Sequence, residues 1–175
     1  MIIQGVTLNG TRVVDGSILT QNLALYYDAN SSTSYPGTGT SVFDLSGNSR
    51  TQTLQAAAQY TTLNGVKCFD CSTGTYYVTA NSAGPALPTT GFTYIAWARM
   101  ISSSAGWRTL FRTTPDDHPI LVELGSNRLG MYDNNGGNFI SCGYDVSSIA
   151  NTWVQWCTTG NSSGQTFYIN GQQVG

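Results

Sequence analysis

The stretch FTYIAWARM, residues 92–100, decides the fold class, because apolar side chains occupy every second position. Successive strand residues point to opposite faces of a sheet, so this alternation predicts a strand with one face against a core. The intervening positions combine Trp97 with Arg99, which predicts a partly exposed face or an interface. The face predicted to be buried consists of Phe92, Tyr94, Ala96, Ala98 and Met100.

Other short apolar or alternating runs lie on both sides of this stretch, separated by Asn-Gly pairs and other turn signals. Only residues 53–59 are compatible with a short helix, and 147–151 with a single helical turn. So many short strands bury their apolar faces only in a closed arrangement, so the pattern predicts an all-β, two-sheet antiparallel jelly-roll sandwich. The predicted strands are 23–28, 66–69, 76–79, 92–100, 109–112, 120–124, 128–132, 139–142, 153–158 and 166–170.

The composition excludes several partners. Charged residues make up 9% of the 175 residues, against roughly 25% in an average soluble domain. The seven Lys and Arg residues cannot form a basic stripe, which argues against nucleic-acid binding. No apolar run approaches the length of a membrane span, so membrane insertion is not expected. The opening MIIQGVT lacks the basic and apolar regions of a secretory signal, which predicts synthesis in a cytoplasm.

Three segments near the N-terminus, NLALYYDA (22–29), SYPGTGT (34–40) and FDLSGN (43–48), resemble the opening of laminin-G-like domains of the concanavalin A-like lectin/glucanase superfamily. The later segments FTYIAW, WVQW (153–156) and FYINGQQVG (167–175) resemble that family's central and late strands. The resemblance implies a concanavalin A-like jelly roll over residues 22–175, with 1–21 as an N-terminal arm or hairpin. It is similar to versions of the domain in structural proteins of large DNA viruses and phages.

The sequence departs from this family in two places. Such domains usually continue for several strands after the Tyr-Ile-Asn-Gly turn, whereas this chain ends at Gly175. We therefore expect a C-terminally incomplete domain, either a piece of a longer protein or one whose last strands come from a partner. In addition, Cys71 follows Phe69-Asp70 where family members have glycine.

Carboxylates and histidine offer little support for an enzyme. A glycosidase of this superfamily needs two carboxyl groups at a fixed spacing, and Glu123 is the only glutamate. The single histidine, His118, follows Asp117 and precedes Pro119, an arrangement typical of a plain turn. We therefore expect a protein that is not an enzyme.

The four cysteines allow a metal-binding, redox or purely structural interpretation. Cys68 and Cys71 form a C-x-x-C pair, but zinc would need a second close pair, and Cys142 and Cys157 are fifteen residues apart. The alternative is that all four are free thiols that act as small hydrophobic residues.

Aromatic residues near loops suggest a carbohydrate site, because a pyranose ring stacks on an aromatic face and its hydroxyls bond to polar groups. The polar loop 133–138 also offers the oxygen ligands that Ca²⁺ prefers, with Asp133 and Asn135 as candidate ligands. A simple Asn/Gly hairpin turn is the alternative explanation of that loop. The candidate glycan-binding residues are Trp107, Tyr132, Asp133, Asn134, Asn138 and Tyr144.

Two functions remain. The resemblance favours a non-enzymatic structural protein of a virion, a minor capsid, fibre or tail component that packs against other virion proteins. The alternative is a carbohydrate-binding adhesin that attaches to host-surface glycans, which would place the protein outside the cell. Fold alone does not separate the two functions.

Overall fold

The computed structural model describes residues 7–8, 11–12, 22–72, 78–80, 91–101, 106–113 and 117–175. The chain divides into two compact units, residues 1–84 and 85–175. Both units are built from antiparallel strands and short 3-10 turns, which confirms the all-β prediction. No helix among the described residues is long and apolar enough to cross a membrane.

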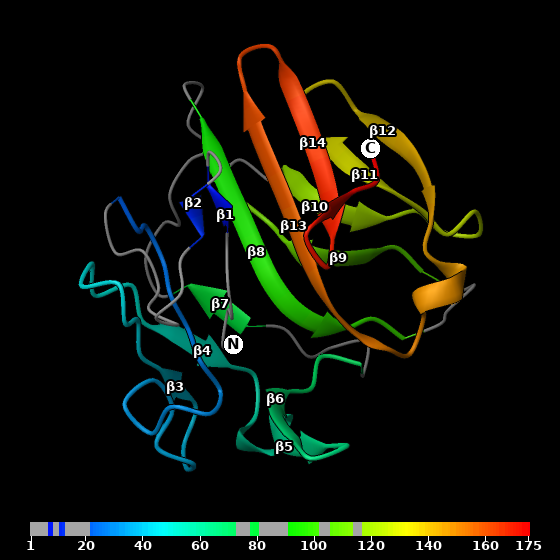
Figure 1. Ribbon diagram of the computed structural model, residues 1–175. Coiled ribbons are helices and arrows are strands. Elements are labelled where there is room, and N and C mark those ends of the chain that lie inside the picture. Colours follow the sequence, from blue (N-terminus) through cyan, green and yellow to red (C-terminus); the bar gives the residue numbers. More distant parts are fainter. Residues whose placement is uncertain are drawn as a thin grey trace. The chain divides into compact units, whose positions relative to one another are not determined.

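The C-terminal unit is a sandwich of two four-stranded antiparallel sheets (Figure 1). One sheet has the order β12-β11-β10-β9 and the other β15-β14-β13-β8. This arrangement confirms the predicted two-sheet sandwich. The first sheet comprises β9 (Arg108–Phe111), β10 (His118–Val122), β11 (Arg128–Asp133) and β12 (Asn138–Asp145). The second comprises β8 (Phe92–Arg99), β13 (Trp153–Asn161), β14 (Gly164–Ile169) and β15 (Gln172–Gln173).

The core of this unit lies between the two sheets. Trp156 on β13 is 1% exposed, and its indole Nε1 donates a hydrogen bond of 3.1 Å to the carbonyl of Ala98 on β8. Every strand except the short β15 contributes to this core or packs against it. The buried core residues are Met100, Ile120, Val122, Leu129, Val146, Val154, Trp156, Phe167 and Ile169.

Strand β8 has the two faces predicted from its alternation. Tyr94, Ala98 and Met100 belong to or pack against the core. Trp97, on the opposite face, is 41% exposed. The full length of β8 pairs with β13, which fixes this polarity because a slip of one residue would exchange the faces.

Strand β10 begins two residues earlier than predicted and contains a bulge. Its pairing with β11 shifts in register between His118 and Leu121. Pro119, which has no N–H to donate, lies within this irregular segment. Its carbonyl accepts a 2.6 Å hydrogen bond from Gln165 Nε2 on β14, so it is tied to the facing sheet.

The segment after the Asn170-Gly171 turn pairs with β14 and forms one edge of its sheet. Beyond β15, the Val174 N–H donates to the Phe167 carbonyl at 2.9 Å, and the Phe167 N–H donates to the Gly175 carbonyl at 2.5 Å. These bonds extend the pairing with β14 to residue 175. Gly175 also lies against Cys142 of β12, since a Cβ on Gly175 would be 2.5 Å from the Cys142 Cβ.

The N-terminal unit contains smaller sheets. Tyr35, Val42 and Leu54 form its buried cluster, and Tyr60 and Phe69 pack against it. Its short strands are β1 (Thr7–Leu8), β2 (Thr11–Arg12), β3 (Ser41–Val42), β4 (Gln52–Leu54), β5 (Tyr60–Leu63), β6 (Val66–Phe69) and β7 (Val78–Ala80). They pair as β1-β2, β3-β4-β7 and β5-β6. The predicted strand 66–69 is confirmed, whereas residues 76–77 of the predicted strand 76–79 lie outside the described residues.

The prediction of a strand over residues 23–28 is wrong, because side chains take the place of a neighbouring strand there. The Tyr26 N–H donates to Asp44 Oδ1 at 3.0 Å. The Ala24 carbonyl accepts from Arg50 Nη1 at 2.9 Å, and the Leu23 carbonyl from Asn48 Nδ2 at 2.8 Å. The backbone of this segment is therefore held without a strand ladder.

The helix considered for residues 53–59 is also wrong. Residues 52–54 form β4, and only the 3-10 turn η1 (Ala57–Gln59) is helical. Gln59 explains the change, because its buried Oε1 accepts hydrogen bonds from the Gln55 and Ala56 N–H groups. The single turn predicted at 147–151 is confirmed as the 3-10 turn η2 (Ser147–Ile149).

Candidate functional site

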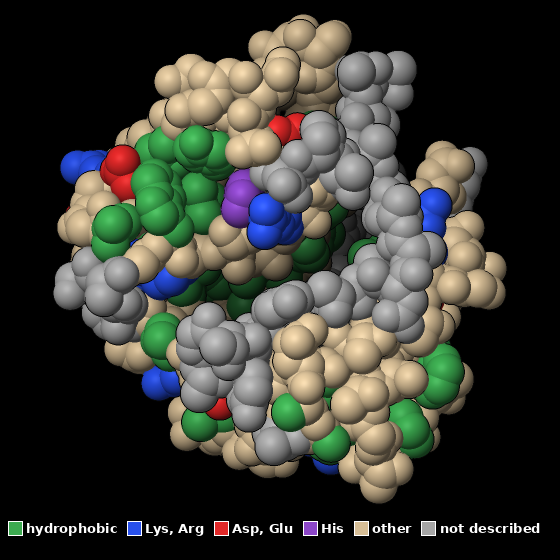
Figure 2. Space-filling view, turned by 180° about the vertical axis from the view of Figure 1, so that it is seen from behind, with side chains coloured by type: hydrophobic (Ala, Val, Ile, Leu, Met, Phe, Trp, Pro, Cys, Tyr) green, Lys and Arg blue, Asp and Glu red, His purple; other side chains and the backbone are tan. Residues whose placement is uncertain are grey.

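Aromatic side chains gather on the outer face of the sheet β12-β11-β10-β9. The ring centroids of Trp107 and Phe139 are 5.4 Å apart, and those of Trp107 and Tyr132 are 6.2 Å apart. The ring of His118 lies 5.8 Å from that of Tyr132. We call these four residues the aromatic patch. In Figure 2 a hydrophobic area borders the purple histidine on this side of the molecule.

The strand register brings the patch together. Tyr132 on β11 is paired with Phe139 on β12 and with His118 on β10, so three side chains meet across neighbouring strands. Gly130 lies two residues from Tyr132 on the same face. A Cβ on Gly130 would lie 2.8 Å from the Phe139 ring, so the missing side chain gives that ring its place.

Trp107 is the exposed member of the patch. It is 47% exposed, although it contacts two other rings. Its ring plane is inclined by 66° to both Tyr132 and Phe139. Edge contacts of this kind are favourable and hold a ring in place, but they do not form one continuous flat surface. The geometry therefore presents the Trp107 ring as a single supported aromatic surface.

Polar loops border the patch. The Asn134 N–H donates to Asp117 Oδ1 at 3.0 Å, which ties the β11–β12 turn to the segment before β10. At the tip of that turn, Asn138 Nδ2 donates to the Gly136 carbonyl at 2.7 Å. Amide and carboxylate groups thus lie on the turn that joins the two strands carrying Tyr132 and Phe139.

Asp133 and Asn135, the predicted calcium ligands, lie in this turn, where the Asp133 carboxylate bonds to the backbone. Asp133 Oδ1 accepts hydrogen bonds from the N–H groups of Asn135, at 2.9 Å, and Gly136, at 3.0 Å. This is an Asx turn, in which the carboxylate serves the backbone. Among the residues that the structure describes, no three His, Cys, Asp or Glu side chains gather in a way that could hold a metal ion. The arrangement fits the hairpin-turn alternative.

His118 makes a further polar contact within the patch. Its Nδ1 is 2.7 Å from Thr109 Oγ1 on the neighbouring strand β9. The hydroxyl can donate to the ring or accept from it, depending on the tautomer. The sequence predicts a plain turn residue at His118, whereas the structure places it at the start of β10 beside Tyr132.

The structure brings together some predicted site residues and separates one. Trp107 and Tyr132 are ring neighbours, and Asp133, Asn134 and Asn138 lie in the adjoining turn. Tyr144 packs instead against the core between the sheets, so it does not join the patch. Phe139 was missed, although its position opposite Tyr132 across the Asn/Gly turn could have indicated a cross-strand aromatic pair.

The two cysteines of the C-x-x-C pair do not form a disulfide, and all four cysteines are free. Cys71 accepts a weak hydrogen bond from Gln59 Nε2, with the sulfur 3.7 Å away. Burial raises the pKa of Cys157 to about 11, so this thiol stays protonated at neutral pH. These contacts agree with the interpretation of the cysteines as small structural residues.

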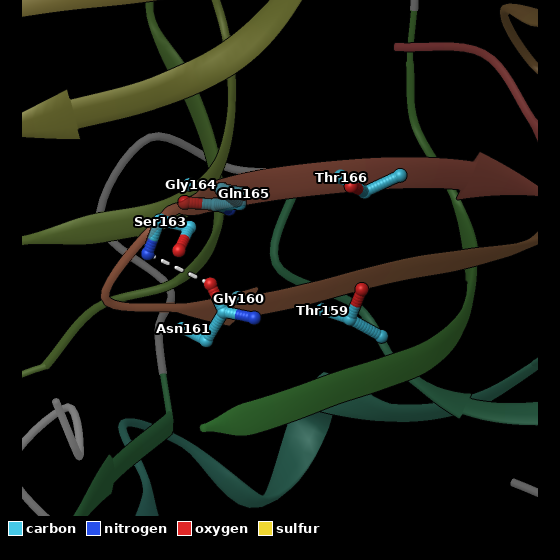
Figure 3. A pocket seen from close by; sticks show the side chains of 7 residues that line it. All are labelled: Thr159, Gly160, Asn161, Ser163, Gly164, Gln165 and Thr166. Carbon is cyan, nitrogen blue, oxygen red and sulfur yellow. Dashed lines mark hydrogen bonds between the residues drawn. The ribbon is translucent and has the colours of Figure 1, made fainter. Parts of the chain in front are cut away.

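A polar hollow of about 410 Å³ lies at the β13–β14 hairpin, apart from the aromatic patch (Figure 3). Across its mouth the Ser163 N–H donates to Asn161 Oδ1 at 2.8 Å, a bond within the turn itself. Ligand pockets are usually lined mainly by apolar groups with a few polar ones, and this hollow lacks an aromatic wall. Its lining residues are Thr159, Gly160, Asn161, Ser163, Gly164, Gln165 and Thr166.

A protein-family model matches the C-terminal part of the chain. The model described as the Concanavalin A-like lectin/glucanases superfamily matches residues 72–175, which is 104 of the 175 residues. No curated protein and no solved structure matched the chain. The matched region includes the whole C-terminal sandwich and every residue of the aromatic patch.

Proposed function

Because the chain belongs to the concanavalin A-like lectin/glucanases superfamily, we propose that it is a non-enzymatic carbohydrate-binding protein. The observation that carries the proposal is Trp107, an exposed indole that contacts the rings of Tyr132 on β11 and Phe139 on β12. Exposed apolar side chains that form one contiguous patch, as the four residues of the aromatic patch do, often mark a binding surface.

The chemistry of the patch suits a sugar ring. The C–H groups of a pyranose face stack on an aromatic ring, and the sugar hydroxyls require donors and acceptors beside it. Asn134 and Asn138, both exposed on the adjoining turn, can supply such groups. The Trp107 ring would then provide the contact area, and the turn would orient the sugar.

The inclination of the rings favours a short glycan. A long polysaccharide would stack best on several coplanar rings in a row. Here the ring planes differ by 66° for both neighbours of Trp107 and by 86° for His118 and Tyr132. We therefore expect the site to hold one or two sugar units.

The surroundings of Glu123 favour binding without hydrolysis. Its Oε2 accepts a hydrogen bond from Ser126 Oγ in the β10–β11 turn, so the carboxylate acts in a local turn. Glycosidases place a second carboxyl group within about 10 Å of the first, across the scissile bond. Glu123 directly follows β10, and its hydrogen bond with Ser126 stays within the β10–β11 turn, so we assign it the role of holding that turn.

A glycan array tests the proposal with a matched pair of tryptophan variants. Trp107→Ala removes the stacking ring and should reduce binding by about tenfold or more, which corresponds to about 1.4 kcal/mol. Trp97→Ala is the control, because Trp97 is similarly exposed, at 41%, but belongs to the other sheet. Binding by the parent protein and by Trp97→Ala, and its loss in Trp107→Ala, is the expected result. No binding to any glycan, or equal loss in both variants, would refute the proposal.

Packing within a virion is a second candidate, favoured by strand β12. This eight-residue strand lies at one edge of its sheet, and its Ile140 is 54% exposed. Exposed edge strands with apolar side chains offer backbone groups and contact area to a neighbouring chain. A structural protein of a particle could use this edge to pack against other virion proteins.

Ile140→Lys tests this second candidate, because a charge on an edge strand opposes strand pairing. Light scattering of the purified chain at increasing concentration, alone and with extracts of assembled particles, would detect association. The candidate predicts association that Ile140→Lys removes. Association unaffected by Ile140→Lys, or a chain that stays monomeric in every mixture, would contradict it.

A further inference from the structure

We infer that Asn64 is a site of spontaneous deamidation, and that its modification loosens the β5–β6 hairpin of the N-terminal unit. In an Asn-Gly pair, the glycine nitrogen can attack the asparagine Cγ. A bond forms between that nitrogen and Cγ, the bond from Cγ to Nδ2 breaks, and ammonia leaves. Water then opens the resulting succinimide to aspartate or isoaspartate. The chain has four Asn-Gly pairs, and Asn9-Gly10 lies outside the described residues.

Asn64-Gly65 forms the tight turn of this hairpin. Leu63 pairs with Val66, so only these two residues connect the strands, and both are exposed. Their φ angles of 52° and 79° are those of a two-residue hairpin turn. The structure records no hydrogen bond from the Asn64 side chain to any residue that it describes. No contact within the described part of the chain holds the amide away from the Gly65 nitrogen.

Asn170-Gly171 has the same backbone conformation but a fixed side chain. Asn170 has a φ of 51°, nearly equal to that of Asn64, so φ does not distinguish the two sites. Asn170 Oδ1, however, accepts a 2.9 Å hydrogen bond from the Gln155 N–H, and the Asn170 N–H donates to the Gln155 carbonyl. The attack would have to break this bond, within a four-stranded sheet.

Asn135-Gly136 is protected at the other reacting group. The Gly136 N–H, which must lose its proton to become the nucleophile, donates to Asp133 Oδ1 at 3.0 Å. Among the described residues, neither restraint is found at Asn64 or Gly65. Moreover, β5 and β6 form a sheet of only two strands, and such hairpins open easily.

The product would disturb the buried cluster of the N-terminal unit. Isoaspartate adds one carbon to the backbone of a two-residue turn, which is incompatible with the Leu63–Val66 pairing. Tyr60 and Phe69 are paired at the other end of the same hairpin. Their rings lie 4.5 Å and 5.6 Å from that of Tyr35, which is 2% exposed. A change of register would alter these contacts.

The test is incubation of the full chain at pH 8 and 37 °C, followed by tryptic digestion and tandem mass spectrometry. Trypsin releases residues 51–67, which contain Asn64, and fragment ions of residues 129–175 report on Asn135 and Asn170. We expect Asn64 to deamidate at least fivefold faster than the other two. Equal or slower conversion of Asn64 would overturn the inference.

Two variants test the physical reasons given for the deamidation of Asn64. Asn64→Gln should remove the modification from 51–67 and should also preserve the near-ultraviolet circular dichroism signal during incubation. Asp133→Ala frees the Gly136 N–H and should accelerate deamidation of Asn135 several-fold. If Asn64→Gln loses that signal as fast as the parent, the proposed loosening is wrong. If Asp133→Ala leaves the deamidation rate of Asn135 unchanged, the hydrogen bond of the Gly136 N–H does not protect that site.

Discussion

Replacement of Gly130 by alanine should destabilise the sandwich through steric overlap alone. A Cβ at this position would lie 2.2 Å from the Ile140 carbonyl oxygen and 2.8 Å from the Phe139 ring. Both are far inside van der Waals contact, and the oxygen belongs to the backbone of the paired strand β12, which cannot turn aside. The backbone of Gly130 has no positive φ, so conformational strain does not contribute.

The magnitude follows from two opposing effects. Overpacking of a tight site costs about 1–3 kcal/mol. Replacement of glycine by alanine returns about 0.4–1 kcal/mol, because it restricts the unfolded chain. We expect a net loss of about 1–2 kcal/mol, which for a protein of this length lowers Tm by roughly 2–8 °C.

Differential scanning calorimetry measures this effect against a matched control. Gly106 also lacks a positive φ, and a Cβ there would have nothing within 4 Å, so Gly106→Ala should leave Tm unchanged or slightly raised. Displacement of the Phe139 ring should also change the tryptophan fluorescence of Gly130→Ala, because Phe139 contacts Trp107. Equal Tm values for the two variants would refute the steric reasoning.

Three further predictions concern stability. Trp156→Phe should lower the free energy of unfolding by about 2–3 kcal/mol in chemical denaturation, because it leaves the Ala98 carbonyl without its indole partner and reduces core packing. A loss below about 0.5 kcal/mol would contradict this role. Burial raises the pKa of Asp44, but hydrogen bonds from Ser46, Tyr26 and Arg50 outweigh it and hold the pKa below its usual value. The stability that Asp44 contributes is therefore present at neutral pH and is lost as the pH falls through its folded pKa. Asp44→Asn should thus flatten the acid limb of a curve of Tm against pH, and an unchanged limb would contradict this role. Burial raises the pKa of Cys157 to about 11 and is the largest cause of the rise in the pKa of Tyr27 to about 12. The stability that these groups contribute is complete below their pKa values in the unfolded chain and falls as the pH rises toward 11–12. Cys157→Ser should therefore lose less stability in alkali than the parent, and identical curves of Tm against alkaline pH would exclude a contribution from Cys157.

The sequence was most informative where one chemical pattern dictates a local outcome. Alternation over residues 92–100 predicted which side of β8 is buried, and the core confirms it. Asn-Gly pairs predicted tight turns, and Asn64 and Asn170 occupy them with positive φ. The pattern failed over residues 23–28, because that segment bonds mainly to side chains of residues 44–50, with one backbone bond from Leu45, rather than to a strand. These bonds span 18 to 26 residues and leave no local periodicity to detect.

The aromatic patch shows the same division between local and distant information. The sequence by itself determined that the chain forms β-strands, and it marked Trp107 and Tyr132 as aromatic side chains near loops. Only the tertiary structure decided that Phe139 and His118 join them, that Tyr144 turns to the core, and that Gly130 leaves room for a ring. The physical reason is that strand type follows from neighbours in the chain, whereas the register between strands depends on contacts distributed over the whole sheet.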